Sequence, residues 1–379
     1  MSRLQQLIQK LCPDGVEFKR LEEVANIIMG TSPKGDTFFS DPSKGIEFHQ
    51  GKTHFGNLIL NCSGVYTSAP IKIAETGSIV MSVRAPVGDT NITDRKIAIG
   101  RGLCAISAKD VVETKFIFYC LNSYINKISR KATGAAFKSI NTNDVKSIKI
   151  PFPPLPVQKE IVRILDTFTE LNKELNAELD ARRKQYKYYR DLLLTFDDDV
   201  EWKKLADIAE IGTGSSNTEE EVENGKYPFF VRSQEIRYKN EYEFDETAII
   251  TAGDGVGVGK VFHYVEGKYA LHQRAYRIHI VDKKVLPKYY FYYMKNVFLS
   301  YIKRNAVYAS VTSIRKHMLE NFPVPVPLLE EQQRIVNILD RFDIFINDSN
   351  IGLHAEIEAR QKQYEYYRDK LLDFKEVIP

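Results

Sequence analysis

The chain of 379 residues contains an internal repeat. Residues 175–191 (LNAELDARRKQYKYYRD) and 353–369 (LHAEIEARQKQYEYYRD) are identical at 12 of 17 positions without a gap. Upstream, 158–168 (QKEIVRILDTF) matches 332–342 (QQRIVNILDRF) at an offset of 174 residues, against 178 for the first pair. Because such self-similarity marks a duplicated structural unit, we expect two related halves.

The repeat extends beyond these two blocks. Residues 15–25 (GVEFKRLEEVA) resemble 199–209 (DVEWKKLADIA), and Pro-rich straps at 149–155 and 323–329 precede both helical blocks. Two weaker alignments pair 84–90 with 255–261, and 97–103 with 270–276. The first residues of the chain also correspond to the segment after the first helical block, so the chain begins part-way through a repeat. This circular order predicts a pseudo-twofold molecule with its termini close together.

The repeated blocks are predicted to be helices. In the first copy, apolar residues recur every three or four positions from Ile161 to Leu179 and form one stripe. Prolines between 151 and 156 are expected to stop any helix before Val157, whereas 158–196 contains neither Pro nor Gly. In the second copy, 348–352 (DSNIG) predicts a turn or kink. If these two helices pack side by side about a twofold axis, they run antiparallel.

Two interpretations of the helices stay open: a coiled coil that only braces the molecule, or helices that also dock a partner. The candidate partner contacts are Ile161, Leu165, Tyr186, Tyr189, Ile335, Leu339, Tyr364 and Tyr367.

The regions between the helices are predicted to be mixed α/β. Strand-like runs lie at 77–83, 96–107, 247–253 and 270–280, and amphipathic helices are expected at 116–128 and 289–302. We therefore predict an α+β fold. Two pseudo-repeated mixed α/β domains (1–157 and 197–329) are separated by two long antiparallel helices (158–196 and 330–379) in a circular pseudo-twofold layout.

The overall charge conceals local contrasts. The chain has 53 Lys and Arg against 50 Asp and Glu, but 260–316 carries 12 basic and 2 acidic residues, and 115–149 carries 7 and 1. It has no apolar run of membrane-spanning length, and its start lacks the apolar stretch of a signal peptide. The four cysteines lack C-x-x-C spacing and are expected to be buried free thiols. These features predict a cytoplasmic protein that is not in a membrane.

Catalytic motifs are not evident in the sequence. The segment GDGVGVGK (253–260) fails both the Walker and the G-x-G-x-x-G patterns and is expected to be a turn between strands. The seven histidines lack H-E-x-x-H spacing, and there is neither a nucleophile elbow nor an Asn/Asp-Pro-Pro-aromatic motif of amino-methyltransferases. We expect a non-enzyme without a metal or cofactor.

Recognition of nucleic acid explains the basic segments better. Residues 127–149 and 301–317, at matching places in the two copies, combine Lys and Arg with Ser, Thr and Asn. Lys and Arg neutralise phosphates, and Asn, Gln and Arg read base edges. The alternative, solvated loops without a ligand, is weakened by this recurrence. The candidate DNA-binding residues are Lys34, Lys52, His54, Arg84, Arg101, Lys131, Lys138, Ser139, Asn141, Asn143, Arg232, Gln234, Arg237, Gln273, Arg274, Lys303, Arg304, Tyr308, Thr312, Arg315 and Lys316.

The layout resembles the specificity (S, HsdS) subunits of type I restriction–modification enzymes, closest to the type IC branch, over the whole length. The similarity is carried by the duplicated helical blocks, with support from the first half. The matching segments are 158–166, 332–340, 181–191, 359–369, SVRAPVGD (82–89), IGRGL (99–103) and GTSPKGDTF (30–38).

The resemblance implies a non-catalytic subunit that binds double-stranded DNA. Its two target-recognition domains would each read one half of a split, asymmetric sequence. The helices would dock two modification methyltransferase (M) subunits, and restriction (R) subunits would join the full complex. S-adenosylmethionine, ATP and Mg would belong to these partners, so no cofactor is expected in this chain. Lys138, Asn141, Arg304 and Arg315 are assigned by residue type and place only.

Rigid helices between two reading domains would act as a ruler. Half-sites on the same face of the duplex lie about 34 Å apart. The tetrapeptides Leu171-Asn-Lys-Glu and Leu175-Asn-Ala-Glu form a short repeat, and one more unit would lengthen the helix by about 6 Å. The gap should then grow by one or two base pairs. A pure protein scaffold and a DNA-binding regulator that works without partners remain the alternatives.

Overall fold

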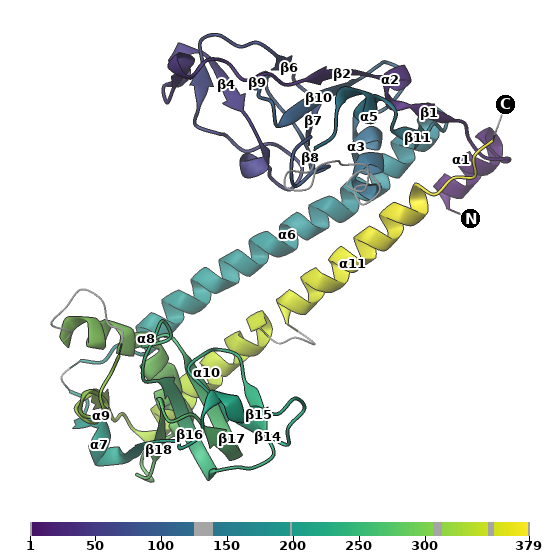
Figure 1. Ribbon diagram of the computed structural model, residues 1–379. Coiled ribbons are helices and arrows are strands. Elements are labelled where there is room, and N and C mark those ends of the chain that lie inside the picture. Colours follow the sequence, from purple (N-terminus) through teal and green to yellow (C-terminus); the bar gives the residue numbers. More distant parts are fainter. Residues whose placement is uncertain (1, 125–138, 198, 306–312, 348–351, 378–379) are drawn as a thin grey trace. The chain divides into compact units, whose positions relative to one another are not determined.

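The computed structural model describes residues 2–124, 139–197, 199–305, 313–347 and 352–377 (Figure 1). The chain divides into two compact units. Unit 1 comprises Met1–Leu175 together with Ile357–Pro379, and unit 2 is the continuous segment Asn176–Glu356.

Unit 1 contains two small sheets. Its strands are β1 (Phe18–Arg20), β2 (Ala25–Met29), β3 (Phe38–Phe39), β4 (Ile46–His49), β5 (Tyr66–Thr67), β6 (Ile73–Ala74), β7 (Ile79–Ser82), β8 (Thr90–Ile92), β9 (Ile97–Ile99), β10 (Leu103–Ala108) and β11 (Lys149–Pro151). One sheet has the order β2-β10-β7-β8 and the other β3-β5-β4-β9-β6, while β1 pairs with β11. Its helices are α1 (Arg3–Leu11), α2 (Leu21–Val24), α3 (Thr114–Ser123), α5 (Thr142–Lys146) and parts of α6 (Leu155–Leu193) and α11 (Leu353–Leu371).

Unit 2 has one larger sheet, in the order β13-β18-β16-β17-β14-β15, and a separate pair of β12 with β19. Its strands are β12 (Trp202–Lys204), β13 (Ala209–Thr213), β14 (Tyr227–Phe230), β15 (Arg237–Lys239), β16 (Phe244–Ala252), β17 (Phe262–Leu271), β18 (Ala275–Ile280) and β19 (Pro323–Pro325). Its helices include α7 (Leu205–Ile208), α8 (Pro287–Asn305), α9 (Lys316–Glu320) and α10 (Leu329–Asn347). The predicted helix at 289–302 lies within α8, and the predicted strand runs at 77–83 and 247–253 are confirmed by β7 and β16. A turn divides 96–107 into β9 and β10, and another divides 270–280 into the end of β17 and β18. Helix α3 ends at Ser123, and residues 125–128 of the helix expected there lie outside the described part.

The sheet of unit 2 is strongly curled. Tyr269 of β17 pairs with Phe244 at the start of β16, yet Ala275 pairs with Ala252 at its end. In a flat sheet, Tyr269 and Ala275 would lie at least about 26 Å apart, because their partners on β16 are eight residues apart. The six residues from Tyr269 to Ala275 can span only about 20 Å, so the sheet must bend to bring them together. In unit 1 the equivalent strands are broken, so the curled sheet is divided into two. Strands β6 and β7 take the place of β16, and β8 and β9 take the place of β17.

The two cores use the same polar contacts at the same places. Gln158 is fully buried, accepts the backbone N–H of Glu113 at 2.9 Å and donates to the carbonyl of Pro153 at 2.8 Å. In unit 2, Gln332 is fully buried as well. It accepts the N–H of Leu286 at 2.8 Å and donates to Pro327 at 2.8 Å. Since a buried amide is costly unless its donors and acceptors are paired, these contacts fix the strap against each helix.

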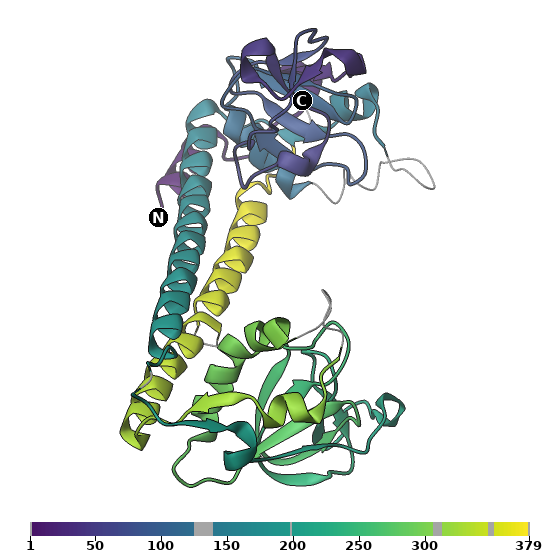
Figure 2. The ribbon, with the colours of Figure 1, turned by 90° about the vertical axis from the view of Figure 1, so that its left-hand side faces the viewer.

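The helix pairs of the two units make equivalent aromatic contacts. In unit 1, α6 and α11 lie side by side (Figure 2). Phe168 of α6 stacks there on Tyr367 of α11 with ring centroids 5.6 Å apart. In unit 2, Phe342 of α10 stacks on Tyr189 of α6 at 5.9 Å. Phe168 and Phe342 are equivalent repeat positions, as are Tyr189 and Tyr367, so each contact is the counterpart of the other. In both pairs the residue numbers run in opposite directions, which confirms antiparallel packing.

The helix boundaries correct two expectations. Helix α6 begins at Leu155 and includes Pro156, although the prolines were expected to stop any helix before Val157. Pro is tolerated in the first turn because N–H groups there have no acceptor within the helix. Helix α6 also ends at Leu193 rather than at 196. The expected kink at 348–352 falls largely outside the described residues, and α10 ends at Asn347 while α11 begins at Leu353.

Four of the candidate partner contacts are core residues instead. Ile161 and Leu165 are fully buried in unit 1, and Ile335 and Leu339 in unit 2. The apolar stripe on each helix therefore packs into the core of its own unit and does not form an open docking face. Tyr186 and Tyr364 pack against the same cores, whereas Tyr189 and Tyr367 remain more than one-third exposed.

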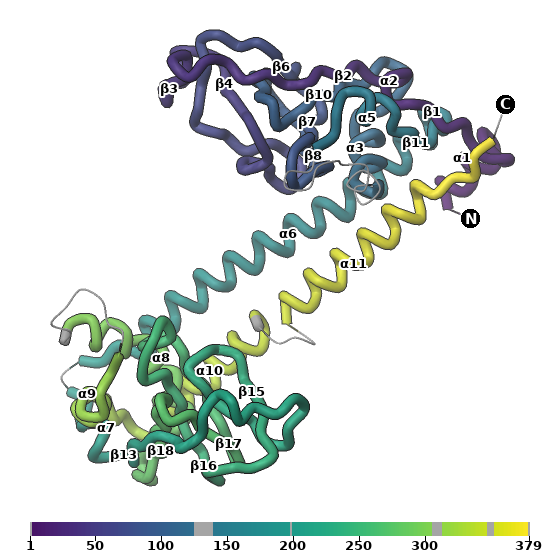
Figure 3. Tube along the Cα trace, in the orientation of Figure 1, coloured from purple at the N-terminus to yellow at the C-terminus, as the bar shows by residue number. Residues whose placement is uncertain are grey.

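Unit 1 is assembled from both ends of the chain (Figure 3). The N–H of Val16 donates to the carbonyl of Lys375 at 2.9 Å, and Val377 donates back to Val16 at 3.0 Å. Leu372 is buried in the core of unit 1 where its repeat equivalent, Leu194, is buried in unit 2. The circular order is therefore present within this unit.

The cysteines and the helices bear on two further expectations. Cys12, Cys104 and Cys120 are free and buried, but Cys62 is free and exposed, which corrects the expectation for that residue. Among the described residues, none of the helices is both long and apolar enough to cross a membrane.

Candidate nucleic-acid interface

Five loops of unit 2 are tied together by backbone hydrogen bonds. The turn at 272–274 lies at the centre: His272 donates to the carbonyl of Phe230 at 2.9 Å, and Gln273 donates to that of Ser216 at 3.0 Å. Gly253, directly after β16, donates to the carbonyl of Arg274 at 2.9 Å and accepts from Ile314 at 2.9 Å. The loops after β13, β14 and β16 and the segment before α9 therefore meet around this turn.

Unit 1 contains the same assembly. Gly100 donates to the carbonyl of His49 at 2.7 Å, and the N–H of Arg101 donates to the hydroxyl of Ser32 at 3.3 Å. Val83 donates to the carbonyl of Gly102 at 2.9 Å and accepts from Ile140 at 3.1 Å. The loops after β2, β4 and β7 and the segment before α5 meet here in the same order.

These matched hydrogen bonds shift the alignment of the repeat by one residue. Isolated bridges pair Arg84 with Ser139 and Asp254 with Ser313, so Arg84 corresponds to Asp254 and not to Gly255. Likewise, 100–102 corresponds to 272–274. The Gly-rich segment is the turn between β16 and β17, as expected, with Gly255 and Gly259 at φ values of +80° and +69° that favour glycine. Val256 at its tip is 95% exposed.

One carboxylate holds two arginines in unit 2. Arg232 Nη1 lies 2.7 Å from Asp254 Oδ1, and Arg274 Nη1 lies 3.3 Å from Asp254 Oδ2. Burial by itself would raise the pKa of Asp254, but the hydrogen bond from Arg232 and the charges of both arginines outweigh it and lower that pKa. The nearby His272 is buried, and desolvation lowers its pKa, so it adds no charge at neutral pH.

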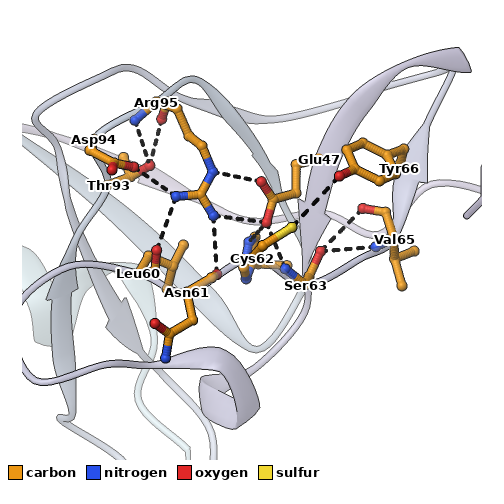
Figure 4. A network of polar contacts seen from close by, with 11 residues as sticks. Glu47, Leu60, Asn61, Cys62, Ser63, Val65, Tyr66, Thr93, Asp94 and Arg95 are labelled. Carbon is orange, nitrogen blue, oxygen red and sulfur yellow. Dashed lines mark hydrogen bonds and ion pairs between the residues drawn. The ribbon is translucent and has the colours of Figure 1, made fainter. Parts of the chain in front are cut away.

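An ion pair between the half-buried Arg95 and the buried Glu47 supports the corresponding loop of unit 1 (Figure 4). Arg95 donates to both oxygens of Glu47, at 2.6 and 2.9 Å, and also to the carbonyls of Leu60 and Asn61 at 3.0 and 3.1 Å. Glu47 accepts the N–H of Ser63 at 2.7 Å as well. These contacts fix the segment between β4 and β5, which contains Lys52 and His54. Lys52 in turn pairs with Asp89 after β7.

Most predicted DNA-binding residues that the structure describes reach the surface. Exposed are Lys34, Lys52, Arg84, Arg101, Asn141, Asn143, Arg232, Gln234, Gln273, Arg274, Lys303, Arg304, Arg315 and Lys316. His54, Ser139 and Arg237 are half-buried. Lys131, Lys138, Tyr308 and Thr312 lie outside the described residues. The candidate interface thus comprises loops that follow several different strands.

Several of these side chains already have partners. The Oδ1 atom of Asn141 caps α5 by accepting the N–H groups of Asn143 and Asp144 at 2.8 and 3.1 Å. Arg237 pairs with Glu221 at 2.7 Å. Gln273 donates to Asn217, and Lys316 forms an ion pair with Glu320. The structure gives Asn141 a capping role that its assignment as a base reader did not anticipate.

Sequence patterns do not reveal the acidic members of the candidate interface. They place Asp254 only within the Gly-rich segment 253–260 and give no role to Asp89 or Glu47. The signal for Asp254 was an acid at the end of a predicted strand, in a turn flanked by arginine-containing segments. Within the described ranges, no group of three or more His, Cys, Asp or Glu side chains is arranged to hold a metal ion.

The comparison with known families agrees with the duplicated architecture. Residues 13–181 and 197–359 both match the type I restriction modification DNA specificity domain. The chain belongs to this family. It is a type I specificity subunit with an α+β fold, and the family resemblance and the fold class seen in the sequence are confirmed.

Proteins of similar sequence align with much of the chain. It is 38% identical over 289 residues to the EcoR124I/EcoR124II specificity subunit of Escherichia coli, covering 69% of this chain and 70% of that protein. It is 28% identical over 397 residues to the putative specificity subunit S.HindORF215P of Haemophilus influenzae, covering 95% and 96%. The solved S subunit of M. genitalium covers 95% of this chain and 97% of its own, with a TM-score of 0.63 and 17% identity. At that identity, the likeness shows a shared fold.

Proposed function

We propose that this specificity subunit reads a split, asymmetric DNA sequence, with one half-site bound by each unit. The observation that carries the proposal is the recurrence of the same five-loop assembly in both units with different side chains. Arg84 in unit 1 corresponds to Asp254 in unit 2, and Arg101 corresponds to Gln273. Because the equivalent positions differ in charge and hydrogen-bonding groups, the two half-sites should differ, and the target should not be a palindrome.

The chain is proposed to act without catalysis of its own. Modification methyltransferase (M) subunits would supply the methyl transfer and bind S-adenosylmethionine, and restriction (R) subunits would bring the ATP- and Mg-dependent steps. This division of labour is supported by the relatives' description as specificity subunits. Of the predicted partner-contact residues, Tyr189 and Tyr367 stay exposed, at 39% and 37%, and they are proposed to contribute to M-subunit docking. Such a complex would act on DNA in the cytoplasm.

The test is to co-express the full chain with its cognate M subunit and to map methylated adenines by single-molecule sequencing. A two-part asymmetric motif, methylated in both halves, is the expected result. A stable complex without any methylated motif would contradict DNA reading and favour a protein scaffold. A sequence-specific, salt-dependent footprint from the chain alone would favour a regulator that works without partners.

A further inference from the structure

The two arginines held by Asp254 come from different loops. Arg232 follows β14, Arg274 lies in the turn between β17 and β18, and Asp254 is the second residue after β16. The arginine side chains are 41% and 61% exposed, against 27% for the aspartate. The acid is therefore the most covered member, and both guanidinium groups reach the solvent beside it.

Each guanidinium keeps donors for a ligand. Arginine has five N–H donors in a rigid fork, and the contacts to Asp254 use the Nη1 atom of each residue. In the part of the chain that the structure describes, neither side chain has another hydrogen-bonding partner. The Nε and Nη2 groups of Arg232 and Arg274 are thus available to donate to a ligand with closely spaced acceptors.

The aspartate favours directional readout over phosphate neutralisation. A site that only attracted phosphate would gain from two unopposed positive charges, and Asp254 removes one of them. What the aspartate adds is orientation: it restrains two long side chains before the ligand arrives, so less conformational entropy is lost on binding. A restrained guanidinium group can donate two parallel hydrogen bonds to two acceptors that lie in one plane. Guanine presents such a pair, N7 and O6, in the major groove.

We propose that Arg232 and Arg274 read guanine in the half-site bound by unit 2, and that Asp254 is the positioning residue that aims them. This inference rests on the proposed function. In unit 1, the matched hydrogen bonds place Gly51, Arg84 and Gly102 at the three equivalent positions. The arrangement of two arginines around one aspartate is therefore a property of unit 2, and it would make the two half-sites chemically different.

The first experiment maps methylated motifs for the full chain in complex with its M subunit, with and without substitutions. The half-site of unit 2 should contain guanine, and Arg232→Ala or Arg274→Ala should relax the requirement for it. The matched control is Arg84→Ala, which should change only the other half. This comparison also assigns each half-site to its unit.

The second experiment uses the unaltered complex and synthetic duplexes in which each guanine of that half-site is replaced by 7-deazaguanine, which lacks the N7 acceptor. Affinity should fall roughly tenfold at a base read by an arginine. The same replacement should have no further effect on the variant that lacks the arginine reading that base. Because this readout needs no mutation in the first arm, a folding defect cannot imitate it.

The third variant separates positioning from structural support. Asp254→Asn keeps the shape but frees the arginines and adds a net positive charge. It should weaken discrimination between guanine and other bases while strengthening non-specific binding, and Asp254→Glu should restore part of the discrimination. A merely structural role would lower specific and non-specific binding together.

The outcomes distinguish this inference from the function on which it rests. Absence of any methylated motif from a stable wild-type complex would overturn the proposed function. A two-part motif whose unit 2 half lacks guanine, or is unchanged in both arginine variants, would overturn the guanine assignment alone. Equal affinities for guanine and 7-deazaguanine duplexes would do the same.

Discussion

The hydroxyl of Tyr292 donates a hydrogen bond of 2.6 Å to Asp340, and Tyr119 donates to Asp166 at the same distance in unit 1. A lysine completes each contact: Lys288 lies 2.9 Å from Asp340, and Lys115 lies 2.7 Å from Asp166. Each contact joins the helix that follows the sheet to the long helix of the repeat. Its persistence in two diverged regions indicates that it fixes the recognition domain to its helix.

Replacing Asp340 by Asn should destabilise unit 2 by about 1–2 kcal/mol, because hydrogen bonds to a charged acceptor contribute more than neutral ones. Asp166→Asn should do the same in unit 1. Urea unfolding of the full chain measures the loss. The control is Glu358→Gln in an exposed ion pair on α11, which should leave the unfolding free energy unchanged. Equal effects of all three substitutions would contradict the assignment.

Leu372→Ala should destabilise unit 1 selectively by about 2–5 kcal/mol, since it leaves a cavity in a close-packed core. The matched substitution, Leu194→Ala, should act on unit 2. Hydrogen exchange locates each effect: protection should fall around β1 and β11 for the first variant and around β12 and β19 for the second. If either variant weakened both units alike, the description of unit 1 as a module closed by the C-terminal residues would be wrong.

Glu47 should make the stability of unit 1 depend on pH. Its burial alone would raise the pKa, but the hydrogen bonds from Arg95, Ser63 and His49 outweigh this and lower the pKa of Glu47 to about 2. The folded-state pKa lies below the unfolded value of about 4.3, so the stabilisation is complete above that value and is lost as pH falls towards 2. Between about pH 6 and about pH 3, the thermal midpoint of Glu47→Gln should therefore fall less steeply than that of the unaltered protein. Parallel curves for the two proteins would count against it.

Lys303→Ala and Arg304→Ala should weaken DNA binding by the complex to a similar degree for all sequences. Both side chains are exposed in the last turn of α8, and loss of one phosphate contact should reduce the slope of log affinity against log salt by about 1. The control is Lys283→Ala, at the opposite end of β18 from Arg274. An altered methylation motif, with an unchanged slope, would instead make these residues base readers.

The repeat was a strong guide to the fold because two copies of one pattern carry the same elements. It could not reveal the pairing of β2 with β10, since these strands are far apart in the sequence and no local pattern encodes their register. It also misplaced Arg84 against Gly255. The turn after β16 is two residues longer than the turn after β7, and a Gly-rich turn absorbs such an insertion without a sequence signal.

The candidate site was only partly predictable for a related reason. Exposed basic residues such as Arg232 and Arg274 stand out by type and place. Their restraint by Asp254 depends on three loops that meet only in the folded unit. For Ile161 and Leu165, the periodicity correctly indicated an apolar face but could not specify that the unit's own core covers it.

The pairing of Val16 with Lys375 has a consequence for the order in which the chain acquires structure during synthesis. Unit 2 is continuous, whereas unit 1 also needs Ile357–Pro379, which are synthesised only after all of unit 2. Because domains fold as units when their segments become available, unit 2 should fold before unit 1 is complete. A nascent chain that stops at residue 356 would carry one complete unit and one unit still open along the surface that Leu372 closes.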